Sequence, residues 1–201
     1  MPHDELPAFL KAVRDYDGDL RTGLALRLIV LTFARTTELR AARWSEFEGL
    51  DGHEPLWRVP STRTKSKREH IVPLAPQAVP LLRELRSLPS SVASPFLFPS
   101  GSREGFMSYN TMLFGLYRMG YHGRATVHGF RAVASTALNE MGFRPDVIER
   151  QLAHQERNAV RGAYNHAQYL GERRSMMEQW AAYLDALASG NVLSFQGKHA
   201  G

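Results

Sequence analysis

The sequence predicts a mainly α-helical domain with one small antiparallel β-hairpin. Apolar residues recur at helical spacing through most of the 201-residue chain. Two short stretches, 55–60 and 70–75, are instead rich in β-forming residues and contain prolines near their ends. The chain has no βαβ alternation and no glycine-rich phosphate loop, which argues against a nucleotide-binding α/β fold.

Helices are expected wherever the apolar period and the end signals agree. Residues 20–34 are apolar nearly all round and predict a central buried helix. Two threonines and an early glutamate mark the start of the segment 36–47. Pro80 indicates that the helix of segment 76–88 begins only near that proline. The expected helices are 5–14, 20–34, 36–47, 76–88, 109–120, 127–141, 145–153 and 171–188.

Several of these ends carry recognisable capping residues. Ser108 and Thr126 are expected N-caps, since their hydroxyls can accept free backbone N–H groups of a first turn. Gly142 suits the left-handed residue that ends a helix, and Pro145 suits the first turn of the next one.

Composition narrows the class of protein. Hydrophobic residues make up 43% of the chain, enough for a real core, and no run reaches the ~18 apolar residues of a membrane span. The N-terminus lacks the order of a signal peptide. The absence of cysteine excludes disulfides and thiolate metal sites, and favours a reducing cytoplasm.

Charge is modest overall but concentrated in one place. The net charge of +5 permits a polyanionic partner without requiring one. Segment 58–70, between the two expected strands, is strongly basic. Such a run is by default a solvated loop, but here a nucleic-acid contact is favoured. Its charged residues are Arg58, Arg63, Lys65, Lys67, Arg68 and, alone in being acidic, Glu69.

A set of polar residues interrupts the apolar pattern. Two arginines can hold the oxygens of one phosphate, a lysine and two histidines can transfer protons near neutral pH, and a tyrosine hydroxyl can act as a nucleophile. Such a set suffices for transesterification at a phosphodiester without a metal. The residues are Arg35, Lys65, His128, Arg131, His154 and Tyr164.

The segments around these residues resemble the catalytic domain of the tyrosine recombinases, close to the integrases of prophages and genomic islands. The resemblance runs from about residue 5 to about residue 187. It rests on four boxes in the family's order, namely LTFARTTELRAARWSEF, RTKSKREHIVPL, HGFRAVASTALNEMGFRPDVIERQLAH and VRGAYNHAQYLGERRSMMEQWAAYLD. The implied fold is that of the catalytic domain of these DNA breaking-rejoining enzymes.

By position, the resemblance implies a role for each residue of the set. Arg35 and Arg131 become the arginine pair, and Tyr164 becomes the nucleophile that forms a 3′-phosphotyrosyl bond and releases a 5′-hydroxyl. Lys65 becomes the general acid for the leaving oxygen. His128 becomes an acid–base partner of the tyrosine, and His154 becomes a donor to the phosphate. No cofactor or metal is implied.

The flanking residues are a separate expectation. Thr37 stands where close relatives commonly have glycine, and we expect the geometry to survive the exchange. Arg173 and Arg174 are expected to form a solvated helix face. Contacts to flanking DNA phosphates are expected from Arg63, Lys67, Arg68, Arg124 and Arg161.

The resemblance also implies an organisation. Residues 1–187 are expected to form the integrase catalytic domain, and residues 188–201 a weakly ordered or partner-docking tail. The arm-binding and core-binding domains of full-length integrases are expected to be absent. The expected partner is double-stranded DNA at an attachment site, bound by a tetramer of the full-length protein. This fragment alone is expected to be a monomer in the bacterial cytoplasm, nucleoid-associated, with no membrane contact.

The residues leave other activities open. A type IB topoisomerase-like nicking and closing activity would use the same chemistry, and a non-catalytic DNA-binding remnant is a further alternative. The intact polar set argues against a remnant. A metal-dependent nuclease would need clustered carboxylates, which Glu38, Glu140, Asp146 and Glu149 do not suggest.

Overall fold

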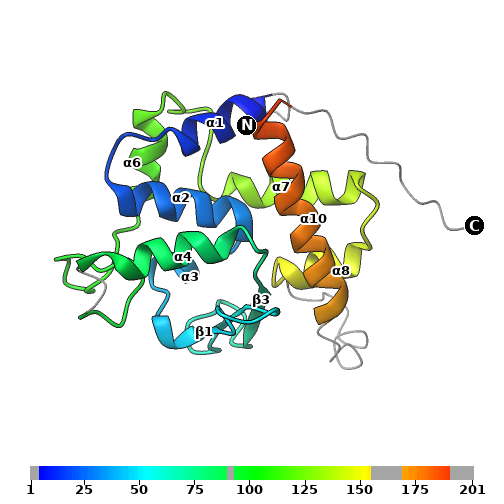
Figure 1. The fold of residues 1–201 in the computed structure, drawn as a ribbon, viewed down its shortest axis with the longest axis horizontal. Coiled ribbons are helices and arrows are strands. Elements are labelled where there is room, and N and C mark those ends of the chain that lie inside the picture. The colour runs from blue at the N-terminus through cyan, green and yellow to red at the C-terminus, as the bar shows by residue number, and fades with distance from the viewer. Residues whose placement is uncertain (1–4, 90–92, 155–168, 191–201) are drawn as a thin grey trace, which may run out of the picture.

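The computed structural model describes residues 5–89, 93–154 and 169–190. Helices dominate these ranges, and a small sheet lies at one end of the molecule (Figure 1). The predicted fold class is therefore confirmed. The helices are α1 (Leu6–Arg14), α2 (Leu20–Thr32), α3 (Thr36–Arg40), α4 (Ala78–Ser87), α6 (Thr111–Arg118), α7 (Gly129–Glu140), α8 (Pro145–Gln151) and α10 (Leu170–Ala188).

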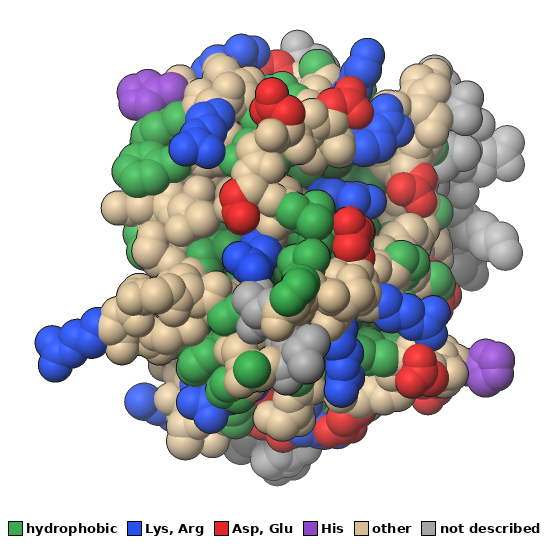
Figure 2. Space-filling model, turned by 60° about the vertical axis from the view of Figure 1, so that its left-hand side comes forward, with side chains coloured by type: hydrophobic (Ala, Val, Ile, Leu, Met, Phe, Trp, Pro, Cys, Tyr) green, Lys and Arg blue, Asp and Glu red, His purple; other side chains and the backbone are tan. Residues whose placement is uncertain are grey.

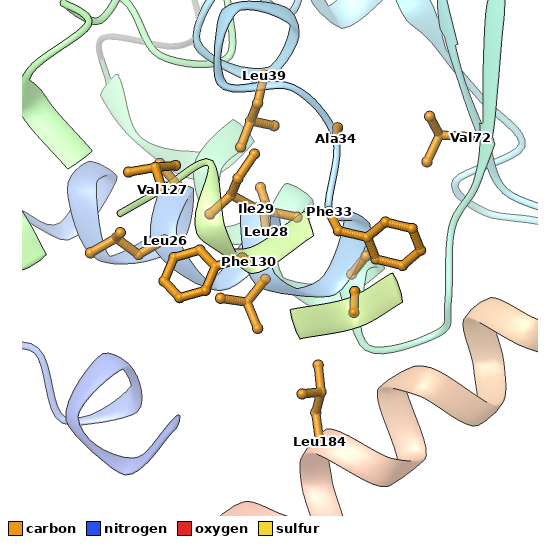
Figure 3. Close-up of a cluster of buried hydrophobic side chains, with 14 of the residues drawn as sticks. Leu26, Leu28, Ile29, Phe33, Ala34, Leu39, Val72, Val127, Phe130 and Leu184 are labelled. Atoms are coloured by element: carbon orange, nitrogen blue, oxygen red, sulfur yellow. The ribbon is translucent and has the colours of Figure 1, made fainter. Parts of the chain in front are cut away.

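Helix α2 forms the centre of the core, as its sequence predicts. Its N-terminus is capped by Asp19, whose carboxylate accepts the Thr22 backbone N–H at 2.9 Å. Leucine and isoleucine side chains of α2 pack with Phe130 of α7 and with Leu184 of α10 (Figure 3). The residue after the helix, Phe33, has a left-handed backbone (φ 36°) and turns the chain toward Arg35.

The sheet has three antiparallel strands in the order β1-β2-β3. The predicted hairpin is confirmed by β2 (Leu56–Val59) and β3 (His70–Pro73), and the short edge strand β1 (Phe47–Glu48) was not predicted. Trp57, in the middle strand, pairs with Phe47 on one side and with Val72 on the other. The basic loop thus connects two strands whose register is fixed by buried residues.

The prediction of one helix over residues 36–47 is wrong. Helix α3 ends at Arg40, and a 3₁₀ turn (Trp44–Glu46) leads into β1. Backbone pairing with the segment 95–97 replaces the helix, since Trp44 N–H donates to Pro95 O and Leu97 N–H donates to Ala42 O, both at 2.9 Å. These long-range partners override the local helical preference.

Other helix ends lie close to the predicted ones. The Thr126 hydroxyl accepts the Gly129 N–H at 3.0 Å, but helix α7 begins at Gly129, so its N-cap residue is His128 and not the predicted Thr126. Gly142 has a φ of +83° and ends the helix. Helix α4 begins at Ala78, so Pro80 lies inside its first turn rather than at its start.

Helix α10 links the two ends of the molecule. It packs against α1 at one end and against α8 and β3 at the other (Figure 1). None of the helices in the described ranges is both long and apolar enough to span a membrane. The expected tail beyond Gly190 lies outside the described residues.

Candidate active site

The structure brings Arg35 and Arg131 to the same turn of the chain. Arg35 lies just before α3, and its Nη2 donates to Ala153 O at 2.7 Å. Arg131, in the first turn of α7, donates to Leu152 O at 2.5 Å and to Phe33 O at 2.8 Å. Because the two guanidinium groups bind adjacent carbonyls of the turn after α8, they are held side by side.

Arg131 keeps its positive charge at neutral pH. Burial lowers the pKa of Arg131 to about 10, and the neighbouring charge of Arg35 acts in the same direction. Arg131 is 5% exposed, so few waters compensate its charge. Two cations held together where solvent is partly excluded favour the binding of an anion, because the anion would relieve the repulsion between them.

Glu38 balances part of this charge. Its Oε1 lies 2.8 Å from Arg35 Nη1, and its Oε2 lies 3.4 Å from Nδ1 of His70, both within ion-pair range. Burial by itself raises the pKa of Glu38, but its contacts with His70 and Arg35 outweigh burial and bring the pKa to about 2. The carboxylate therefore stays ionised and fixes the Arg35 side chain.

His154 follows the turn that binds the two arginines. Ala153 has a left-handed backbone (φ 51°), which redirects the chain after α8. The half-exposed His154 ring has its Nδ1 2.6 Å from Glu149 Oε2. A shallow pocket joins this turn to the hairpin loop, lined by Ser66, Arg68, Glu69, His70, Arg150, Ala153, His154 and Arg173.

Lys65 and His128 are both exposed to solvent. Lys65 lies in the β2–β3 loop beside Ser66, which lines the pocket. The loop is closed by Thr64, whose hydroxyl contacts Arg68 O at 2.7 Å. His128 immediately precedes α7, and its carbonyl accepts the backbone N–H of Arg131 at 3.2 Å. The predicted nucleophile, Tyr164, lies outside the described residues.

Comparison with known proteins identifies the family. The chain matches the phage integrase family over residues 1–170. It belongs to that family. The integrase of Enterobacteria phage P4 is 44% identical over 203 residues, covering 92% of this chain and 45% of the relative. Prophage integrase IntZ of Escherichia coli (strain K12) is 41% identical over 192 residues, covering 95% of this chain and 46% of the relative.

Solved structures agree at the level of the fold. The XerH site-specific recombinase bound to its difH substrate has a TM-score of 0.59 at 21% identity, covering 89% of this chain and 54% of that one. A lambda integrase dimer bound to a core site gives 0.55 at 18% identity, covering 78% and 57%. The resemblance to tyrosine recombinases is thus confirmed for family and fold. The chain spans about half the length of the curated relatives it matches.

The structure corrects the prediction that Arg173 and Arg174 form a solvated helix face. Arg173 is fully buried, and its guanidinium donates to Gln151 Oε1 at 2.7 and 3.0 Å and to Ile71 O. Burial lowers its pKa to about 9. The side chain of Arg174 is only 16% exposed and lies 3.5 Å from Glu54. Both arginines therefore attach α10 to the rest of the fold.

The expected DNA-flanking residues divide into two groups. Arg63 turns inward, where it binds the Glu46 carboxylate and donates to Glu38 O at 3.1 Å, which favours a structural role. Arg124 forms an ion pair with Glu5 at 3.0 Å. In the hairpin loop, Lys67 and Arg68 keep exposed side chains. Arg161 lies outside the described residues.

Charge elsewhere on the surface is mixed. Basic and acidic side chains are interspersed on the face that Figure 2 shows, in keeping with the modest net charge of +5. Among the residues that the structure describes, no three His, Asp or Glu side chains gather as a metal site would require. Thr37 lies within the first turn of α3 in a helical conformation, so threonine is unstrained there.

Sequence reasoning missed three polar residues that hold this site together. Glu38, His70 and Gln151 are all buried, at 0%, 4% and 0% exposure. A glutamate three residues after Arg35, at the start of a helix, was the available signal for Glu38. No local sequence signal marks His70 or Gln151, because the two residues contact each other across 81 residues of chain.

Glu38 makes the free energy of unfolding depend on pH in the acid range. Its pKa is about 2 in the folded chain against 4.5 ordinarily, so its contribution is complete above pH 4.5 and is lost as the pH falls toward 2. We expect Glu38→Gln to reduce the free energy of unfolding by about 3 kcal/mol at neutral pH. The difference from wild type should shrink in urea titrations at decreasing pH.

The matched control is Glu84→Gln, which alters an exposed carboxylate on α4. It should leave the free energy of unfolding within ~0.5 kcal/mol of wild type. A difference between Glu38→Gln and wild type that stays constant from neutral to acid pH would contradict the assigned pKa.

Proposed function

We propose that this chain is the catalytic part of an integrase that performs site-specific DNA recombination through a 3′-phosphotyrosyl intermediate, without a metal. The observation that carries the proposal is the convergence of Arg35 and Arg131 on adjacent carbonyls, Ala153 O and Leu152 O. Membership in the phage integrase family supports it, as do relatives named as integrases of a phage and a prophage.

The arginine pair suits a phosphate that is being displaced. In the transition state, negative charge grows on the non-bridging oxygens of the phosphorus. Arg35 and Arg131 are already charged and already fixed by backbone carbonyls and by Glu38. Fixed cations aimed at developing charge need little rearrangement, and this is commonly the largest contribution to catalysis.

The remaining residues supply the nucleophile and the proton transfers. Tyr164 attacks phosphorus, so that a phosphotyrosine bond forms while the bond to the 5′-oxygen breaks. Lys65, exposed on the hairpin loop, protonates the departing oxygen. His128 acts as acid–base partner of the tyrosine, and His154 donates to the phosphate. The new ester conserves the bond energy, so a 5′-hydroxyl from another strand can reseal the DNA without ATP.

The proposed partner is duplex DNA carrying an attachment site, with Lys67 and Arg68 contacting the backbone beside the cleaved phosphate. Such contacts add affinity that falls steeply with salt. A tetramer of the full-length protein would bring two duplexes together for exchange. This chain alone is proposed to be a monomer located with bacterial DNA in the cytoplasm.

Covalent trapping tests the proposal. The chain is incubated with a nicked duplex that carries the cognate attachment site, in the presence of a chelator, and then denatured. We expect a protein–DNA complex that survives the denaturant. Failure of the folded chain to form it, or a complex that requires added metal, would contradict the mechanism. Exchange between two such duplexes, rather than mere relaxation of a supercoiled plasmid, distinguishes recombination from nicking and closing.

A further inference from the structure

His70 is a buried polar residue to which the proposed chemistry assigns no task. It opens β3 and is 4% exposed, so it cannot touch DNA. Its Nε2 lies 3.0 Å from Gln151 O at the end of α8, and its Nδ1 lies 3.4 Å from Glu38 Oε2 in α3. The ring therefore lies between the two elements that hold the arginine pair.

Both partners of the ring are hydrogen-bond acceptors. A backbone carbonyl can only accept, so the proton on Nε2 belongs to the bond with Gln151 O. Nδ1 has no hydrogen-bond partner among the described residues and lies 3.4 Å from the ionised Glu38 carboxylate, so the ring attracts that carboxylate as an ion only when Nδ1 also carries a proton. Burial lowers the pKa of His70, while Glu38 acts in the opposite direction and the charge of Arg173 adds to the lowering.

The ring is connected to the arginine pair by two short paths. Through Glu38 it reaches Arg35, because the other oxygen of that carboxylate binds Nη1 of Arg35 at 2.8 Å. Through Gln151 it reaches the turn whose carbonyls, at residues 152 and 153, accept from Arg131 and Arg35. Arg173 ties the same helix end to β3 by binding Gln151 Oε1 and Ile71 O.

We propose that His70 is a positioning residue for DNA cleavage, which holds Glu38 and the turn after α8 so that Arg35 meets the phosphate. The inference rests on the proposed function of the arginine pair. It assigns His70 a task different from packing alone, namely coupling of the β3 strand beside the hairpin loop to the anion site.

A double-mutant cycle tests the coupling. The rate of covalent complex formation at saturating nicked DNA is measured for wild type, His70→Leu, Arg35→Ala and the double variant. We expect His70→Leu to slow cleavage roughly 10-fold, in line with couplings between contacting residues, with unchanged DNA affinity. In the Arg35→Ala background, the same substitution should slow cleavage no further.

A second variant and a matched control separate positioning from folding. His70→Gln keeps one amide donor, should recover part of the rate, and replaces His70→Leu in the cycle if that variant does not fold. Val72→Ala removes buried volume from the same strand, so it should lower the melting temperature while preserving the cleavage rate of the folded chain.

Two outcomes would overturn the role of His70. One is an unchanged cleavage rate in both folded His70 variants, and the other is equal slowing with and without Arg35. Either result leaves the proposed function intact, since the wild type would still form the covalent complex. A folded wild-type chain that forms no complex would instead reject the function and this inference together.

Discussion

Replacing Tyr164 with phenylalanine is expected to abolish the covalent protein–DNA complex. Phenylalanine keeps the ring but lacks the phenolic oxygen that must bond to phosphorus, so no ester can form. The substitution leaves the charges of Arg35 and Arg131 in place, and DNA affinity should therefore persist. Denaturing electrophoresis after incubation with nicked DNA measures the complex, and a gel-shift titration measures the affinity.

A neighbouring tyrosine supplies the control. Tyr169 immediately precedes α10, and its ring lies 5.2 Å from the Arg144 guanidinium. Tyr169→Phe keeps this ring contact and should form the complex at a rate close to that of wild type. Loss of the complex in Tyr169→Phe, together with its survival in Tyr164→Phe, would show that the nucleophile is the other tyrosine.

Much of the fold could be predicted because its signals are local. Helix α2 is predicted by a sequence that is apolar nearly all round. The hairpin is predicted by two short β-rich runs on either side of a basic loop. Gly142 marks a helix end through its own backbone conformation. Each of these features depends on residues that lie near one another in the sequence, so pattern and structure agree.

The features that could not be predicted depend on distant partners. Helix α3 stops early because residues 42 and 44 bond to the segment 95–97. Arg173 has the sequence context of a solvated residue, yet acceptors 22 and 102 residues away in the chain bury it. The local sequence does not distinguish a helix face that is exposed to water from one that packs against a backbone carbonyl and a glutamine side chain.

The candidate site shows the same division. The chemistry of the residue types selected Arg35 and Arg131, which the fold holds against one turn. The basic loop looked uniform, but Arg63 turns inward because Glu46 lies across from it, while Lys67 stays exposed. The charge of the loop permitted a polyanionic partner, but only the acceptors placed by the fold show which of its cations remain at the surface.

Replacing Arg131 with alanine is expected to slow cleavage by roughly 10²–10³-fold, the size of the loss when one fixed donor to a developing anion is removed. The side chain is protonated at neutral pH, since its pKa is about 10. Two backbone carbonyls fix its guanidinium, so the charge needs no rearrangement when the phosphate expands. The rate is measured as covalent complex formed per unit time at saturating nicked DNA.

Because Arg131 is buried, stability must be measured alongside the rate. Alanine leaves Phe33 O and Leu152 O without this donor, which should cost about 1–3 kcal/mol of unfolding free energy. Assays are therefore run well below the melting temperature of the variant. Arg131→Lys keeps the charge but cannot reach both carbonyls, so its rate should lie between those of alanine and wild type.

Arg83→Ala is the matched control, because this arginine is exposed on α4 and pairs with Asp51 at 3.0 Å. It should cleave at the wild-type rate, since surface pairs of this kind contribute little to stability. If folded Arg131→Ala cleaves as fast as Arg83→Ala, the charge beside Arg35 is not used in the transition state. The convergence of the two arginines would then serve the architecture of the turn after α8 and not the phosphate.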